Sequence, residues 1–238
     1  REALGLPRIA DVWNHTLGGT VLLATDAALS PPAPDIARRC LQTGYPWREA
    51  TGALDDEVLG FLARGPAPIY VGFGSMPLLA PGQSAAFFAE AAERANVRLV
   101  VSPGLTEIPP GTLNERCLVV GDVPHDVLFA RCSAAVHHGG AGTLATATRA
   151  GLPQGLAPFA TDQFYWAARV PELGLGPASV MRTKLDATRL ADMLRQLQEQ
   201  AAYRARAREL AGILRAQDSL RATREAIERL GFGTSPAA

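Results

Sequence analysis

From residue 67 onward, short apolar segments alternate with segments of helical periodicity, and this alternation constrains the fold more than any other feature of the chain. The sequence predicts strands within the apolar segments, at 68–74, 97–102, 117–123, 133–138 and 153–159. Helices are expected at 55–64, 82–95, 141–151, 162–174, 186–200 and 201–230. Because strands that alternate with helices form a parallel sheet, we predict an α/β fold with a doubly wound, Rossmann-like sheet.

The sequence divides into three predicted parts. Residues 1–50 contain a short helix end, an apolar run and a proline-rich connector, and they read as leftover structure plus an interdomain linker. Residues 51–200 carry the predicted sheet, and residues 201–238 form a C-terminal helix and tail. The chain starts at Arg1 without an initiator methionine, so we expect it to be a fragment.

The composition argues against several functional classes. The formal net charge is zero, which gives no support for electrostatic binding to nucleic acid. The three cysteines, Cys40, Cys117 and Cys132, are too widely spaced for a disulfide framework or a metal-binding knuckle. The sequence has neither an apolar run of membrane-spanning length nor a signal peptide, so we expect a cytoplasmic protein. Lys184 is the only lysine, a bias that suggests a GC-rich bacterial genome.

Four loops follow predicted strands and should meet at one edge of the sheet. In a doubly wound sheet, ligands bind at the carboxyl ends of the strands. The loops at that edge are "GFGSM" at 72–76, "GDVPHD" at 121–126, "HHGGAGT" at 137–143 and "FATDQ" at 159–163. The sequence therefore predicts one shared cleft.

The loop "HHGGAGT" suits phosphate chemistry. Gly139 and Gly140 remove side chains where the backbone would approach an anion, and a helix begins directly after them. The first N–H groups of a helix have no partner inside it, and its dipole favours negative charge there. His138 and the hydroxyl of Thr143 could add hydrogen bonds to a phosphate oxygen.

Other interpretations of these loops stay open at this point. A metal site is disfavoured, because His137 and His138 are neighbours on a strand and point to opposite faces. A tight strand-to-helix turn with a buried histidine would also explain the glycines. Asp162 could simply cap the helix that follows it, and "GFGSM" alone is a weak signal.

Several motifs together resemble a known family. "PIYVGFGSM", "VPHDVLFARCSAAVHHGGAGT" and "PFATDQFYWAARVPELGLGP" resemble the C-terminal, donor-binding half of GT-B glycosyltransferases of the UDP-dependent superfamily. The similarity is dense from residue 67 to residue 177. Within the superfamily, the chain is most similar to the sterol 3β-glucosyltransferase branch, and bacterial enzymes that glycosylate antibiotics share much of the pattern.

The resemblance implies a role for each matching residue. His138 matches the histidine on the diphosphate of a nucleotide sugar, where it stabilises the leaving group. The remaining matches are the helix-start phosphate cradle (Gly140, Ala141, Gly142 and Thr143), the loop beside the phosphate (Gly74 and Ser75), the nucleobase segment (Val123, Pro124 and His125) and the pair on the sugar hydroxyls (Asp162 and Gln163). Plant relatives have a tryptophan and a glutamate where this chain has Asp122 and Thr146, which leaves base stacking and the ribose contact open.

The resemblance also implies a reaction. A hexose, with UDP-glucose as the favoured donor, passes with inversion to a hydroxyl of a lipophilic acceptor such as a sterol. No metal cofactor is expected, because His138, Thr143 and the helix start would stabilise the leaving diphosphate. The catalytic base and the acceptor pocket of this family lie in the N-terminal domain, of which residues 1–50 would keep only a remnant. We therefore expect the isolated chain to bind donor without turnover, and any membrane contact to depend on the missing domain.

Alternative functions remain at this stage. An antibiotic glycosyltransferase that uses a dTDP- or UDP-sugar, or a non-catalytic nucleotide-sugar binder, would share most of these motifs. A nucleotide-sugar epimerase would need further carboxylates in the cleft. A dinucleotide-dependent dehydrogenase would need a GxGxxG loop and an acidic partner for the ribose, and the chain lacks both.

Overall fold

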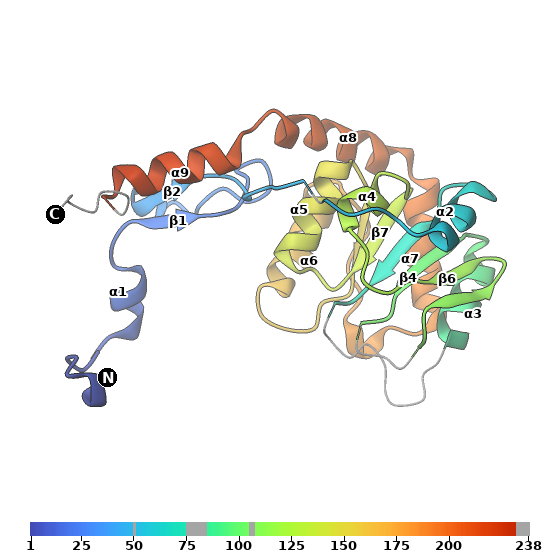
Figure 1. Cartoon of the computed structure of the whole chain (residues 1–238), viewed down its shortest axis with the longest axis horizontal. Helices are drawn as coiled ribbons and strands as arrows, with labels where there is room; N and C mark the ends of the chain where they lie inside the picture. Colours follow the sequence, from blue (N-terminus) through green and yellow to red (C-terminus); the bar gives the residue numbers. More distant parts are fainter. Residues whose placement is uncertain (50, 75–84, 105–107, 232–238) are drawn as a thin grey trace. The chain divides into compact units, whose positions relative to one another are not determined.

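A computed structural model describes residues 1–49, 51–74, 85–104 and 108–231 of the chain. Figure 1 shows the ribbon, coloured along the sequence. The chain folds into two compact units: the smaller comprises Arg1–Arg48 and Gln217–Ala238, and the larger comprises Glu49–Ala216.

The larger unit contains a six-stranded sheet with the order β5-β6-β4-β3-β7-β8. Its strands are β3 (Ile69–Gly72), β4 (Leu99–Ser102), β5 (Gly111–Asn114), β6 (Cys117–Val119), β7 (Ala134–His137) and β8 (Gln154–Leu156). All neighbouring strands are parallel except β5 and β6. The predicted α/β fold with a doubly wound parallel sheet is therefore confirmed.

The antiparallel edge strand β5 was not predicted. It turns into β6 at Asn114, whose Oδ1 accepts hydrogen bonds from the backbone N–H groups of Arg116 (2.8 Å) and Cys117 (2.9 Å). The asparagine side chain thus closes the turn without a glycine. Because β5 is half-exposed and short, it has no continuous apolar run that would mark it in the sequence.

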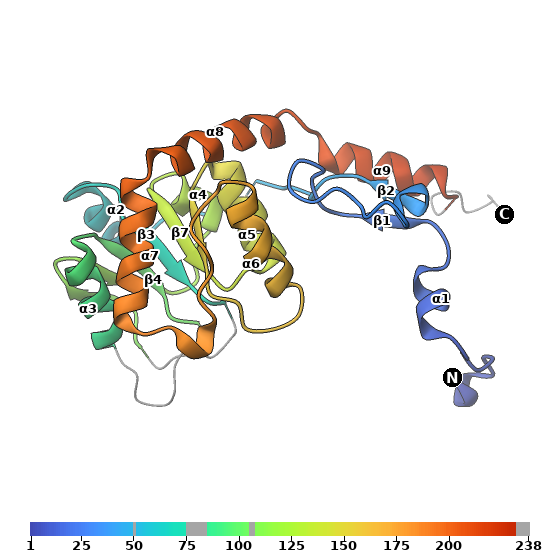
Figure 2. The ribbon, with the colours of Figure 1, turned by 180° about the vertical axis from the view of Figure 1, so that it is seen from behind.

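Helices cover both faces of this sheet. They are α2 (Asp56–Ala63), α3 (Ala85–Ala95), α4 (His125–Phe129), α5 (Ala141–Ala150), α6 (Gln163–Glu172), α7 (Ala187–Glu199) and α8 (Ala201–Arg215). On one face, α3 and α7 pack on side chains of β3, β4 and β7. Figure 2 shows the ribbons of these two helices in front of the strands. On the other face, α2, α4 and α5 pack on the alternate side chains of the same strands.

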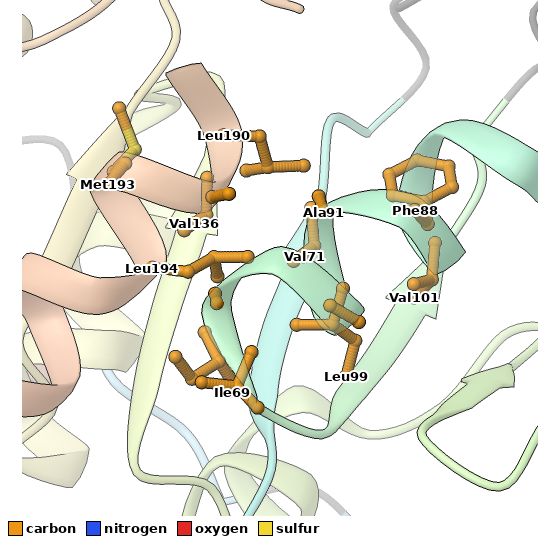
Figure 3. Packing of buried hydrophobic residues seen from close by; sticks show 14 of the residues in the cluster. Ile69, Val71, Phe88, Ala91, Leu99, Val101, Val136, Leu190, Met193 and Leu194 are labelled. Atoms are coloured by element: carbon orange, nitrogen blue, oxygen red, sulfur yellow. The ribbon is translucent and has the colours of Figure 1, made fainter. Parts of the chain in front are cut away.

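Alternation along β3 explains the two cores. Ile69 and Val71 point to the α3 and α7 face, whereas Tyr70 between them points to the α2, α4 and α5 face. Figure 3 shows the first core, where Leu190 of α7 and Phe88 of α3 meet the strand side chains. Since successive strand residues face opposite sides, a central strand buried on both faces is apolar throughout, as β3 is.

The smaller unit joins the two ends of the chain. It contains η1 (Glu2–Leu4), α1 (Val12–Leu17), β1 (Val21–Leu23), η2 (Ala37–Arg39), β2 (Cys40–Gln42) and α9 (Ser219–Arg229). Strands β1 and β2 form a parallel pair. The backbone N–H of Trp47 donates to the hydroxyl of Ser219 at 3.2 Å, which ties the early segment to the start of α9.

The predicted helix 201–230 is in fact two helices in different units. Asp218 caps α9, because its carboxylate accepts a hydrogen bond from the backbone N–H of Arg221 at 3.0 Å. Helix α8 buries Ala207, Leu210 and Leu214 within the larger unit. Helix α8 thus lies in the larger unit, which ends at Ala216, and α9 lies in the smaller unit. Among the described helices, none combines the length and the apolar character needed to cross a bilayer.

Candidate functional site

The switch point of the sheet lies between β3 and β7. The chain runs from β3 to β4 on one side, whereas β7 pairs with β3 on the other side. Gly72 and His137, the last residues of these strands, are directly paired. Ligands of doubly wound sheets bind outside the carboxyl ends at such a point, so the loops after β3 and β7 start side by side where a ligand is expected. Ser75, the predicted partner of Gly74, lies outside the described residues.

His138 lies between two glycines. A Cβ atom at Gly74 would lie 3.0 Å from the Cε1 atom of the His138 ring, and one at Gly140 would lie 2.5 Å from its Nε2 atom. Gly74 also has a φ of +60°, which disfavours other residues there. The ring therefore occupies space that exists only because both flanking positions lack side chains.

His138 is half-buried, and its burial favours the uncharged imidazole. Burial lowers the pKa of its imidazole, and the nearby carboxylate of Asp162 partly opposes this shift. Its Nδ1 atom is buried and has no hydrogen-bond partner in the described part of the chain. A neutral imidazole of this kind can donate one hydrogen bond to an anion.

His137 is fully buried, and both of its ring nitrogens face groups of the chain itself. Its Nδ1 accepts a hydrogen bond from the backbone N–H of Gly139 at 3.1 Å, and its Nε2 lies 2.9 Å from the Oε1 of Gln154. Burial lowers the pKa of His137 to about 4. Both ring nitrogens are thus occupied, and the rings of His137 and His138 are nearly perpendicular, at 85°. The pair cannot chelate one metal ion, and the buried-histidine interpretation holds for His137.

Helix α5 begins directly at this loop. Gly140 is its N-cap residue and makes no side-chain cap. Ala141, Gly142 and Thr143 of the first turn are partly exposed, and the N–H groups of a first helical turn have no partner inside the helix. The hydroxyl of Thr146 donates to the carbonyl of Gly142 at 2.9 Å, so it serves the helix itself.

Asp162 and Gln163 lie beside the same loop but differ in character. A Cβ atom at Gly139, whose φ is +95°, would lie 3.3 Å from the carbonyl oxygen of Gln163, so the start of α6 packs directly on the glycine loop. The side chain of Asp162 is exposed and makes no cap hydrogen bond to α6, although the Thr161 hydroxyl donates to it at 3.0 Å. The capping alternative for Asp162 is therefore wrong.

Gln163 has a structural role that the sequence did not reveal. Its side chain is buried, and its Oε1 accepts hydrogen bonds from the backbone N–H groups of Phe159 (2.7 Å) and Ala160 (3.1 Å). The amide oxygen therefore shapes the loop before α6. Only the amide nitrogen of Gln163 is left as a donor toward a ligand.

A cavity of about 470 Å³ adjoins the loop after β3. It is lined by Gly74, by Ser102 at the end of β4, and by residues that follow β6, among them Asp122, Val123 and His125. The Nε2 of His125 lies 2.9 Å from the hydroxyl of Tyr70, and its ring stacks on Phe129 with centroids 5.1 Å apart. Burial lowers the pKa of His125, whereas the negative charges of Asp122 and Asp126 act in the opposite direction and raise it. Gly74 therefore contacts both this cavity and His138.

Residues 96–224, more than half of the chain, match the family described as "Erythromycin biosynthesis protein CIII-like, C-terminal domain". The chain belongs to this family. The expected resemblance to the C-terminal half of GT-B glycosyltransferases is confirmed by the relatives of this CIII-like domain. A sterol 3-beta-glucosyltransferase of Arabidopsis thaliana is 39% identical over 181 residues, which are 73% of this chain and 28% of that protein.

Antibiotic glycosyltransferases match the CIII-like domain at nearly the same identity. The vancomycin aglycone glucosyltransferase of Amycolatopsis orientalis is 38% identical over 178 residues, which are 75% of this chain and 43% of that protein. The chain thus spans between about a quarter and less than half the length of these relatives.

Solved structures share the fold of the CIII-like domain. The glycosyltransferase of kitacinnamycin superposes with a TM-score of 0.74 at 22% identity, over 95% of this chain and 59% of that one. The glycosyltransferase SnogD of Streptomyces nogalater has a TM-score of 0.62 at 26% identity, over 87% of this chain and 55% of that one.

Proposed function

We propose that this chain is the donor-binding part of an inverting glycosyltransferase, which transfers a hexose from a nucleotide diphosphate sugar to a hydroxyl group. The observation that carries the proposal is the position of His138 between Gly74 and Gly140, at the N-terminus of α5. A diphosphate there would meet the imidazole donor and the free amides of the first helical turn together.

The chemistry follows from charge. When the bond from the anomeric carbon to the diphosphate breaks, negative charge grows on the phosphate oxygens. Donors that are already in place stabilise that charge more in the transition state than in the bound substrate, which lowers the barrier. His138, Thr143 and the start of α5 are the donors that we assign to this task, without a metal ion.

The rest of the donor has candidate contacts in the neighbouring loops. The exposed carboxylate of Asp162 and the amide nitrogen of Gln163 would bind sugar hydroxyls, as acceptor and donor respectively. The cavity lined by Val123 and His125 would hold the nucleobase. We assign the acceptor pocket and the general base to the part of the relatives' length that this chain does not span.

UDP-glucose and a lipophilic acceptor such as a sterol are our first choice of substrates. The motif pattern implies this donor and this acceptor class, and the Arabidopsis thaliana relative is a sterol 3-beta-glucosyltransferase. A natural-product aglycone with a dTDP- or UDP-sugar is the second choice, because the vancomycin aglycone glucosyltransferase is nearly as similar.

Calorimetric titration with UDP, UDP-glucose, dTDP and NAD tests the proposal. We expect UDP to bind, and we expect His138→Ala to weaken it by roughly ten- to a hundredfold, the value of a hydrogen bond to a charged group. The matched control is His15→Ala, which removes an exposed histidine of the smaller unit. Preference for NAD, or equal UDP affinity in the wild type and the His138 variant, would contradict the proposal.

A further inference from the structure

A chain of hydrogen bonds runs through the interior from the glycine loop to α5. The backbone N–H of Gly139 donates to Nδ1 of His137 (3.1 Å), and Nε2 of His137 lies 2.9 Å from Oε1 of Gln154. The Nε2 of Gln154 donates to the hydroxyl of Thr148 (2.8 Å), which donates to the carbonyl oxygen of Leu144 (2.8 Å). The side chains of His137, Gln154 and Thr148 are completely buried.

The two ends of this series of hydrogen bonds determine which group donates and which accepts in every bond of it. A backbone N–H can only donate, so Nδ1 of His137 must be the acceptor and the proton sits on Nε2. That proton requires the oxygen of Gln154, which turns the amide nitrogen toward Thr148. The Thr148 hydroxyl then donates to a carbonyl that can only accept. Reversing Gln154 would put a donor against the Nε2 proton of His137, so only one arrangement satisfies every group.

The first hydrogen bond of this series, from Gly139 to His137, also constrains the backbone at His138, the residue between them. Gly139 and His137 flank His138, and the bond from the Gly139 amide to the His137 ring closes a tight turn around it. Gly139 adopts a φ of +95°, which disfavours other residues, and a Cβ atom there would lie a tight 3.2 Å from Cδ2 of Leu156. The Gly139 amide is occupied, so the amides left for an anion are those from Gly140 onward.

We propose that His137, Gln154 and Thr148 are positioning residues, which hold the turn that aims the His138 imidazole at the N-terminus of α5. The expected effect on donor binding rests on the proposed function. The positioning of the His138 ring does not, because it depends only on contacts among residues of this chain. None of the three side chains is exposed, so they act on a ligand only through His138 and the glycine loop.

Thr148 provides the sharpest test, because it is farthest along the chain of bonds from His138. Thr148→Val removes the hydroxyl at nearly constant volume, and Thr148→Ser keeps it. The matched control is Thr223→Val in α9, where the hydroxyl makes the same kind of bond to a carbonyl four residues earlier, at 2.7 Å. The variants are compared in the full chain by UDP titration and by NMR of the four histidine rings without ligand.

We expect Thr148→Val to weaken UDP binding about fivefold, the worth of one hydrogen bond, and to shift the ring signals and titration of His138. Thr148→Ser and Thr223→Val should stay within about twofold of the wild type. In a His138→Ala background, Thr148→Val should cost no further affinity, because the residue through which it acts is gone.

The outcomes separate the two proposals. Suppose that the wild type binds no UDP, but that the NMR signals of the His138 ring shift in Thr148→Val and not in Thr148→Ser or Thr223→Val. The positioning then stands and the proposed function fails. An unchanged His138 ring in Thr148→Val overturns the positioning. An equal loss of UDP affinity in Thr148→Val and Thr148→Ser also overturns it. The same holds if Thr148→Val weakens UDP binding as much in the His138→Ala background as it does in the wild type.

Discussion

The imidazole of His138 fills the place where a side chain at Gly140 would stand, since a Cβ atom there would lie 2.5 Å from Nε2. Gly140 has φ −64° and ψ 135°, a conformation open to any residue. The requirement for glycine is therefore steric and comes from His138, not from the backbone.

Gly140→Ala should displace the His138 ring and weaken UDP binding about tenfold or more, as loss of a charge-assisted hydrogen bond would. Thermal unfolding should show a loss of stability that is recovered when His138→Ala is added, because the clash is then removed. Gly60→Ala in α2 is the control, since a Cβ atom there has no neighbour within 4 Å. Failure of the double variant to recover stability would contradict the steric explanation.

Asp162→Ala separates a sugar contact from a helix cap. Because the carboxylate makes no cap bond, we expect no loss of stability, whereas loss of a capping aspartate costs about 1 kcal/mol. Asp186→Ala is the positive control, because Asp186 does cap α7 by accepting from the Arg189 backbone N–H at 2.8 Å.

The same Asp162 variant should weaken UDP-glucose binding and leave UDP binding unchanged in calorimetry. A carboxylate that accepts from sugar hydroxyls contributes only when the sugar is present. Equal weakening of both ligands would mean that Asp162 acts on the diphosphate site, for example through the pKa of His138.

Burial of neutral His137 predicts a stability that falls in acid. Its pKa is lowered from 6.5 to about 4, first by burial and further by the neighbouring His138 and His125, while the bond to Gln154 opposes the shift. Between these pH values the unfolded chain binds a proton at His137 and the folded chain does not. The contribution is therefore present above pH 6.5 and is lost as the pH falls toward 4.

Urea unfolding at pH 7 and pH 5 measures this contribution. The wild type should lose about 2 kcal/mol more on acidification than His137→Gln, from one and a half pH units at 1.36 kcal/mol each. The comparison with His137→Gln isolates the contribution of this one ring, because the rest of the sequence is the same in both proteins. Identical losses in the two proteins would contradict the buried neutral ring.

Arg98 is a buried cation whose side chain donates hydrogen bonds to backbone carbonyl groups. Its guanidinium donates to the carbonyl oxygens of Pro66, at 3.0 Å, and Phe61, and lies 4.0 Å from the centroid of the Phe61 ring. Arg98→Met keeps the apolar stem but leaves two carbonyls without donors. We expect a loss of about 2–3 kcal/mol in the free energy of unfolding, with no change in UDP affinity. A selective loss of UDP affinity would show that this end of the sheet affects the ligand site.

Local pattern was enough for the main elements of the larger unit. The apolar runs around Ile69, Leu99 and Ala134 and the helical segments between them predicted a parallel sheet, and the glycines after His138 predicted a strand-to-helix turn. These features depend on neighbours in sequence, where periodicity and turn chemistry act directly.

Tertiary structure decided what local pattern could not. Residue spacing gave no sign that Gly72 would pair with His137, that Gln154 and Thr148 would complete the hydrogen bonds of His137, or that α8 and α9 would belong to different units. Likewise, only the folded chain shows that Asp162 makes no cap and that the Gln163 oxygen is already used.

By itself, then, the sequence determined the α/β alternation and the chemistry available at the carboxyl edge. The structure decided which of the two adjacent histidines is fully buried and which lies half-buried beside the glycine loop. Strand order brings Gln154 to His137 and Gly74 to His138. The burial and hydrogen bonds that distinguish the two rings therefore arise only once β3, β7 and β8 are paired.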